Sequence, residues 1–253
     1  MDFETEIDRL RTRVAPLSKF VHALCKSMPP PKFFRTEFEA GFRYEKPELV
    51  HFCLLRSVRV VSALNASIEL ARYGYSQEIG VLLRTAIEYD SQITFMIASR
   101  RKDGSLSPDA DAFVSSFFKD ANRPGSNEDK KARLVQKRIH NTIGARLDGI
   151  VGRSKNAKTA SEMMTNVYVI FSNYVHAKYP ESMDLYGGGP AHFHLKGMSR
   201  TPKDMENLEI LETLITSASI CMAGLAQAFE MRDVLNSDPE LATWYNRMTK
   251  TPS

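Results

Sequence analysis

Apolar residues recur every three or four positions along most of this chain, and this spacing places them on one face of an α-helix. The helices predicted from it span residues 2–27, 47–72, 76–100, 108–121, 128–150, 159–177 and 203–236, followed by a short helix that starts at Asp238. The alternation typical of a β-strand occurs only around residues 191–196, where a minor β-ribbon would fit. The predicted fold class is therefore all-α, an antiparallel helical bundle with a long Gly/Pro loop.

The predicted helices over residues 47–72 and 76–100 are the most apolar part of the chain. Only residues 73–75 separate them, and Ser76 is placed to cap the second helix. Two long helices joined by so short a turn must lie antiparallel. We expect this helical hairpin to form the centre of the core.

Proline and glycine mark the breaks between the predicted helices. Pro16 is expected to kink or split the first helix, and three consecutive prolines at 29–31 end it. Residues 32–45 then form an irregular connector rich in aromatic side chains. Residues 178–202, which contain a Gly-Gly-Gly-Pro run, form the longest irregular segment.

The chain is expected to form a single helical domain. Its parts are an N-terminal helix and connector (1–45), a core bundle (46–177), the loop (178–202) and C-terminal helices (203–253). Small residues recur from Ser217 to Ala228 in the last long helix and let another helix approach closely. This close approach has two interpretations, which are packing within the chain and the seam of a homo-oligomer.

Composition indicates a folded, cytoplasmic protein. Hydrophobic residues make up 43% of the chain and charged residues 25%, which are ordinary values for a globular domain. Cys25, Cys53 and Cys221 are scattered and form no Cys-x-x-Cys pair, which predicts reduced thiols. The N-terminus lacks the apolar stretch of a signal peptide. The longest uncharged run, Thr213 to Phe229, is too short and too polar to cross a membrane, so no membrane association is expected.

Positive charge is concentrated in the middle of the chain. Residues 97–160 contain 14 Lys and Arg against 7 Asp and Glu, although the whole chain has a net charge of only +4 at pH 7. In a predicted helix of this region, Lys130, Arg133 and Lys137 fall on one stripe, with Arg138 beside them. This face is either a phosphate-binding surface for nucleic acid or a solvated helix face.

Three polar residues stand out elsewhere. Arg84 and Glu88 are four residues apart in a predicted core helix, so they share a face as either a surface ion pair or a pair that lines a pocket. His176 ends another predicted helix, where a histidine either caps the last carbonyl groups or carries protons in a reaction. We expect the three to converge in space, since a charged pair on a core helix needs partners once it is desolvated.

Three short motifs lie between residues 50 and 180. They are Ser67-Ile-Glu-Leu-Ala-Arg-Tyr-Gly-Tyr, then Gly80-Val-Leu-Leu-Arg84-Thr-Ala-Ile-Glu88, and finally Ser172-x-x-Val-His176. The segment that carries them resembles a family of uncharacterised bacterial helical proteins related to the HEPN superfamily. The resemblance implies a helical bundle that often dimerises. It also implies RNA cleavage in toxin–antitoxin or phage-defence systems, with an antitoxin or defence protein as partner, although other HEPN domains have no activity.

The usual catalytic signature of HEPN domains is an arginine followed, after four to six residues, by a histidine on the same helix. Residues 169–171, which precede His176, are Val, Ile and Phe, so Arg84 would have to supply the arginine from another helix. The spacing is met by Arg133 and His140. In a chain with six histidines, however, about one match of so loose a pattern is expected by chance.

Histidines also raise the question of a metal. In an extended segment His192 and His194 would point the same way, and His176 precedes them by one loop. No cysteine or carboxylate accompanies them at metal-ligand spacing. The chain also lacks a phosphate-binding glycine loop, a Gly-x-Ser-x-Gly motif and a His-Glu-x-x-His motif. We therefore expect neither a metal nor a cofactor.

Two functions from different classes are compatible with these features. In the first, the protein acts on or binds RNA, and any cleavage is metal-independent: His176 would supply acid–base catalysis, Arg84 would stabilise phosphate charge, and Glu88 would orient one of them. In the second, the protein is a non-catalytic module for dimerisation or partner binding, and the same three residues form a buried polar lock. A small-molecule or nucleotide pocket beneath the 178–202 loop is a third interpretation.

Overall fold

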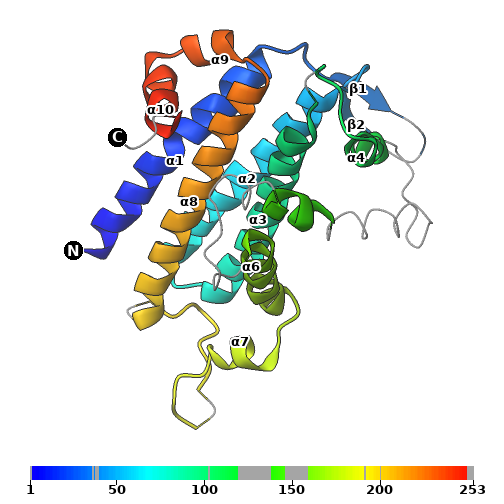
Figure 1. The fold of residues 1–253 in the computed structure, drawn as a ribbon. Helices are drawn as coiled ribbons and strands as arrows, with labels where there is room; N and C mark the ends of the chain where they lie inside the picture. The colour runs from blue at the N-terminus through cyan, green and yellow to red at the C-terminus, as the bar shows by residue number, and fades with distance from the viewer. Residues whose placement is uncertain are drawn as a thin grey trace.

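The computed structural model of the chain describes residues 2–35, 37, 40–101, 103–118, 138–145, 159–190, 192–199 and 201–249. Within these residues the protein is mostly helical, and its helices pack together beside one two-stranded antiparallel hairpin (Figure 1). The prediction of a helical protein is confirmed. The hairpin, which lies near the N-terminus, replaces the irregular connector predicted there.

The described elements follow one another along the chain as helices broken by a single hairpin. They are α1 (Phe3–Lys26), β1 (Lys32–Arg35), β2 (Ala40–Arg43), α2 (Leu49–Arg72), α3 (Ser76–Ser99), α4 (Pro108–Phe118), α6 (Ala160–Val175), α7 (Tyr179–Met183), α8 (Pro202–Ala228), α9 (Arg232–Asn236) and α10 (Pro239–Thr249). Residues 138–145 are helical as well.

The helical hairpin predicted at the centre of the chain is confirmed, since α2 and α3 make the most extensive contact between any two described elements. At the start of α2, a ring nitrogen of His51 accepts the backbone N–H of Glu48 at 3.1 Å and caps the helix. At its end, Gly74 adopts a left-handed φ of +69° and turns the chain directly into α3.

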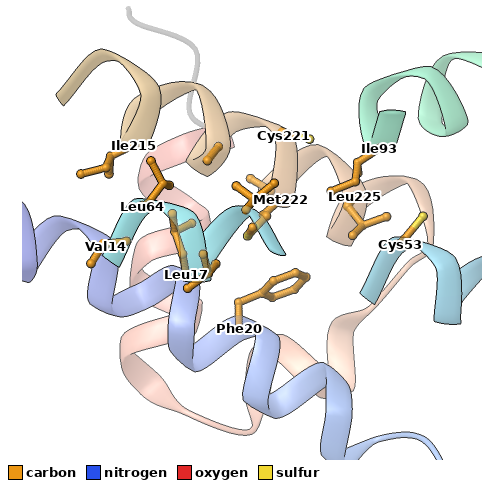
Figure 2. Close-up of a cluster of buried hydrophobic side chains, with 14 of the residues drawn as sticks. Val14, Leu17, Phe20, Cys53, Leu64, Ile93, Ile215, Cys221, Met222 and Leu225 are labelled. Carbon is orange, nitrogen blue, oxygen red and sulfur yellow. The ribbon is translucent and has the colours of Figure 1, made fainter. Parts of the chain in front are cut away.

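The core lies where α1 and α8 pack against this hairpin (Figure 1). Each of the four long helices contributes fully buried apolar side chains, including Phe20 from α1, Leu64 from α2, Ile93 from α3 and Met222 from α8 (Figure 2). The thiols of Cys53 and Cys221 lie in the same core, and all three cysteines are free, as predicted. Burial raises the pKa of the Cys53 thiol to about 12, so this thiol is neutral and packs as an apolar group.

The N-terminal region differs from the prediction in two ways. Pro16 lies inside α1, which continues without a split because its buried stripe, from Ile7 to Leu24, is held by the rest of the core. The predicted connector is the β1–β2 hairpin, in which Phe33 pairs with Phe42 and their ring centroids lie 5.4 Å apart. Aromatic pairs of this kind stabilise neighbouring strands.

The loop predicted over residues 178–202 contains more structure than expected. Its first residues form the short helix α7. The anticipated ribbon is reduced to an isolated bridge between Tyr186 and Phe193, flanked by a hydrogen bond from the His194 N–H to the Leu185 carbonyl at 2.8 Å. No regular strand forms in the described part of this loop.

The last predicted helix is interrupted. α8 ends at Ala228, Glu230 adopts a left-handed φ of 52°, and α9 begins at Arg232. The break turns Met231, Val234 and Leu235 back toward the core, where they are buried. Burial of these apolar side chains offsets the strain of a non-glycine residue in that conformation.

Several small residues of α8 pack within the chain. Ala218, Ala223 and Ala226 are buried, and a Cβ at Gly224 would lie 3.8 Å from Ile97 Cδ1 on α3. Among the described helices, α2 and α8 are long and apolar enough to cross a membrane, and half of each apolar window is buried inside the protein.

An ion-pair cluster joins α1 to α8 at the edge of the core. Glu212 accepts hydrogen bonds from Arg9, at 2.6 and 2.8 Å, and from Arg13. The bonds from Arg9 lower the pKa of Glu212 to about 2. The carboxylate therefore keeps its charge, and the contact between the two helices, well into the acidic range.

Candidate functional site

Arg84 is held in place by three groups. Its Nη1 donates to Glu88 Oε2 at 2.7 Å, and its Nε donates to Ser172 Oγ at 2.9 Å. The guanidinium carbon lies 3.5 Å from the centroid of the Tyr168 ring, close enough for a cation–π contact. Because Ser172 and Tyr168 belong to α6, Arg84 connects the core helix α3 to α6.

One feature of the sequence allows α6 to come this close to α3. Gly80, one turn before Arg84, has no side chain, and a Cβ there would lie 2.5 Å from Cγ of Tyr174. The Tyr174 ring therefore rests directly on the backbone of α3. At the other end of α6, Thr159 and Glu162 form a reciprocal capping box that sets where the helix begins.

A polar hollow of about 460 Å³ opens between α3 and α6, here called the α3–α6 hollow. Its lining residues are Arg84, Thr85, Glu88, Tyr168, Val169, Ser172, Asn173, Val175, His176 and Lys178. All three residues predicted to be catalytic therefore line one hollow. The side chain of Arg84 is 12% exposed and that of Glu88 33%, so the pair is partly buried and accessible from the hollow.

His176 lies at the rim of the hollow rather than in contact with the pair. It is the C-cap residue of α6, its backbone N–H donates to the Ser172 carbonyl at 3.1 Å, and its side chain is exposed. Within the described residues, its ring makes no hydrogen bond to Arg84 or Glu88. The structure thus joins Arg84 to Glu88 directly and brings His176 to the same hollow, where an added ligand could contact all three.

His140 is a second histidine near the pair, although it was not among the residues predicted to be catalytic. It is only 5% exposed, and its ring centroid lies 5.1 Å from that of Tyr168, which also contacts Arg84. Burial lowers the pKa of His140, and the nearby charge of Arg84 lowers it further, against a smaller opposing effect of Glu88. Its Nε2 is buried and has no hydrogen-bond partner in the described part of the chain. The Arg133–His140 spacing was the one signal in the sequence that pointed to this residue.

The depressed pKa of His140 predicts a pH-dependent stability. Since the pKa of a free histidine lies near 6.5, the unfolded chain binds a proton below that pH more readily than the folded protein does. The contribution of His140 is therefore complete above pH 6.5 and is lost as the pH falls toward the folded pKa. We expect urea denaturation to show a smaller loss of stability between pH 7 and pH 5 in His140→Gln than in the parent protein. The exposed His22→Gln should behave like the parent, and equal slopes in all three proteins would contradict the assignment.

The predicted basic face falls largely outside the described residues. Lys130, Arg133 and Lys137 belong to the segment that the structure does not describe. Arg138 is described, with a side chain 64% exposed, and its Nη1 lies 3.0 Å from Asp109 Oδ2 on α4. An ion pair this exposed is weak, so Arg138 remains accessible to a phosphate.

The two neighbouring histidines of the loop do not form a metal centre with His176. The rings of His192 and His194 lie 5.0 Å apart, next to Gly187, where a Cβ would lie 2.7 Å from His192 Nδ1. Among the residues that the structure describes, no group of three or more His, Cys, Asp or Glu side chains could hold a metal ion.

The fold and the hollow define a mostly helical protein with a partly buried Arg–Glu pair at the wall of an open polar site. Comparisons with protein-family models, with curated proteins and with solved structures found no match for this chain. The resemblance to HEPN-related proteins therefore rests on the short motifs of the sequence, of which Arg84, Glu88, Ser172 and His176 now lie around one hollow.

Proposed function

We propose that this protein binds RNA and holds a phosphate group of the RNA in the α3–α6 hollow. The observation that carries the proposal is the position of Arg84. Glu88, Ser172 and Tyr168 fix its guanidinium group at the wall of the hollow, so little side-chain freedom is lost when a ligand binds. Its Nη2 has no hydrogen-bond partner within the described residues and is left to donate to a phosphate oxygen.

The charges around the hollow also suit an anion. Lys178 and Arg84 line it, against one carboxylate, that of Glu88, among the described residues. Residues 138–145 pack beside the start of α6, where Ser161 Oγ donates to Asn141 Oδ1 at 3.0 Å, and they belong to the basic segment 97–160 of the sequence. A chain of phosphates could therefore follow positive charge from the hollow along this side.

RNA is the nucleic acid that the HEPN resemblance implies. If the bound RNA is also cleaved, His176 supplies acid–base catalysis, Arg84 stabilises the developing phosphate charge, and Glu88 orients Arg84. We place this activity in the cytoplasm, in a homo-oligomer that works with an antitoxin or defence partner.

A second candidate function is favoured by the same hydrogen bonds. Arg84 donates hydrogen bonds to Glu88 and Ser172, and the bond to Ser172 connects α3 to α6. In a non-catalytic module that works by dimerisation or partner binding, this connection would serve only as a polar lock that keeps the two helices in register.

Lys178→Glu tests RNA binding without disturbing the lock, because Lys178 is an exposed residue outside the Arg84 hydrogen bonds. We expect the variant to bind a labelled single-stranded RNA about tenfold more weakly and to lower the salt-dependence slope by about one phosphate contact. Filter retention across a salt series gives both quantities. Lys26→Glu, an equal charge reversal at the end of α1, is the matched control and should bind nearly as the parent does.

Two further variants separate the candidate functions. His176→Ala should keep its stability in either case, and in a ribonuclease it should lose cleavage of the bound RNA. Ser172→Ala should lose about 1 kcal/mol of stability if Arg84 is a lock. Two results would contradict the RNA-binding function and leave the polar lock as the remaining candidate. One is a parent protein without salt-sensitive RNA binding, and the other is an equal loss of RNA affinity in Lys178→Glu and Lys26→Glu.

A further inference from the structure

A second cavity has a volume of about 230 Å³ and is here called the Asp90 pocket. It is lined by other residues of α6 than the α3–α6 hollow. α6 and α8 both pack on α3, and the pocket lies between them, above residues of α2 and α3. Its lining residues are Val60, Leu64, Ala86, Ile87, Asp90, Ser91, Met163, Met164, Val167, Leu214, Ser217 and Ala218. All but three of these side chains are apolar.

The pocket opens to solvent along α6. Met163 and Val167, which line it, are 53% and 40% exposed, whereas Leu64 and Ala218 at its inner end are buried. An apolar cavity of about 150 Å³ is known to hold a benzene ring. The Asp90 pocket can therefore take a ring or a short alkyl chain together with a small polar head group.

Asp90 is the one ionisable group among the described residues of the lining, and none of these residues carries a positive charge. Its Oδ2 accepts a hydrogen bond from Ser217 Oγ at 3.0 Å, while its Oδ1 is buried without a partner in the described part of the chain. Among the described residues, no lysine, arginine or histidine lines the pocket. Burial raises the pKa of Asp90, against weaker effects of Cys221 and Ser217. An ionised carboxyl group in such surroundings destabilises the folded protein unless it binds a cation or a proton.

We propose that the Asp90 pocket binds a small apolar molecule that carries one primary ammonium group. The ammonium group contacts the Asp90 carboxylate and the Ser217 hydroxyl, and the apolar part lies among the side chains of α2, α3 and α6. The carboxylate supplies the charge that complements the ammonium group, and the apolar walls contact the rest of the molecule. This site is separate from the α3–α6 hollow and does not depend on RNA binding.

Hexylammonium chloride, 1-hexanol and sodium hexanoate test the proposal, because they share a six-carbon chain and differ only in the head group. Isothermal titration of the full chain at neutral pH should show hexylammonium binding at least about tenfold more tightly than hexanol, with no binding of hexanoate. Asp90→Asn should lose this preference and bind hexylammonium and hexanol alike. Asp233→Asn removes one exposed carboxylate on α9, away from the pocket, and should bind all three molecules as the parent does.

Val167→Phe provides a second variant that does not alter the charge. Val167 is partly exposed at the mouth of the pocket, so a larger ring there should block entry without disturbing the core. We expect it to abolish binding of both hexylammonium and hexanol while the helical circular dichroism spectrum stays unchanged. Equal affinities of the parent for the amine and the alcohol, or undiminished binding by Val167→Phe, would overturn the proposal.

Discussion

Replacing Phe20 by alanine should lower the free energy of unfolding by about 3–5 kcal/mol, a large fraction of the total for a domain of this size. Phe20 is fully buried where α1 faces α8, and its ring centroid lies 5.9 Å from that of Trp244 on α10. Figure 2 shows it pointing into the cluster that contains Leu17 and Met222. Because side chains from several helices surround this ring, none of them can move in to fill the space that it leaves.

Urea denaturation followed by circular dichroism measures this effect. Phe33→Ala is the matched control, since Phe33 is 62% exposed and its ring packs on Phe42 across the β1–β2 hairpin. Its loss should stay below about 1 kcal/mol. A similar loss in both variants would mean that Phe20 is not at the centre of the core.

Gly197→Ala should be the most damaging small substitution in the loop after α7, at about 2–4 kcal/mol. Gly197 has a left-handed φ of +88°, and a Cβ there would lie 1.8 Å from the carbonyl oxygen of Tyr73. The neighbouring Met198 is buried, and its N–H donates to the Gly74 carbonyl at 2.8 Å. The substitution should therefore lift this part of the loop off the α2–α3 turn.

Gly188→Ala separates the clash from the backbone strain. Gly188 has a similar φ of +79°, but nothing lies within 4 Å of the position that its Cβ would take. We expect it to lose only about 1–2 kcal/mol, and we expect limited proteolysis to cut Gly197→Ala, but not Gly188→Ala, faster than the parent within the loop. Equal behaviour of the two variants would contradict a tight contact at the turn.

The Arg84–Glu88 pair has opposite consequences in the two candidate functions. As a lock, the pair is complete in the free protein, and its contribution is measured as stability. As a phosphate site, it is incomplete until the RNA reaches Nη2, and its contribution is measured as affinity. Lys178 and His176 lie on the same hollow but outside the hydrogen bonds of Arg84, so their variants change the second quantity without the first.

Local patterns in the sequence were sufficient to predict most of the long helices and to predict which two helices form the centre of the core. A stripe of apolar residues at helical spacing reports which face of a helix avoids water, and this was enough to predict α2, α3 and their antiparallel packing. It was also enough to select Arg84 and Glu88 as candidate site residues, since two charged residues on a core helix require partners. The same patterns failed at Pro16, where the packing of α1 outweighed a local breaker, and at Glu230, where buried residues of α9 outweighed local strain.

The partners of Arg84 were decided by the tertiary structure alone. Ser172 and Tyr168 are more than 80 residues away along the chain, and they reach Arg84 only because Gly80 lets the ring of Tyr174 rest on α3. His140 comes near the pair through Tyr168, and nothing in the sequence predicted this contact. Periodicity records that a side chain is buried. Which side chain it meets depends on how closely two helix backbones approach, and that distance is set by residues elsewhere on the two helices.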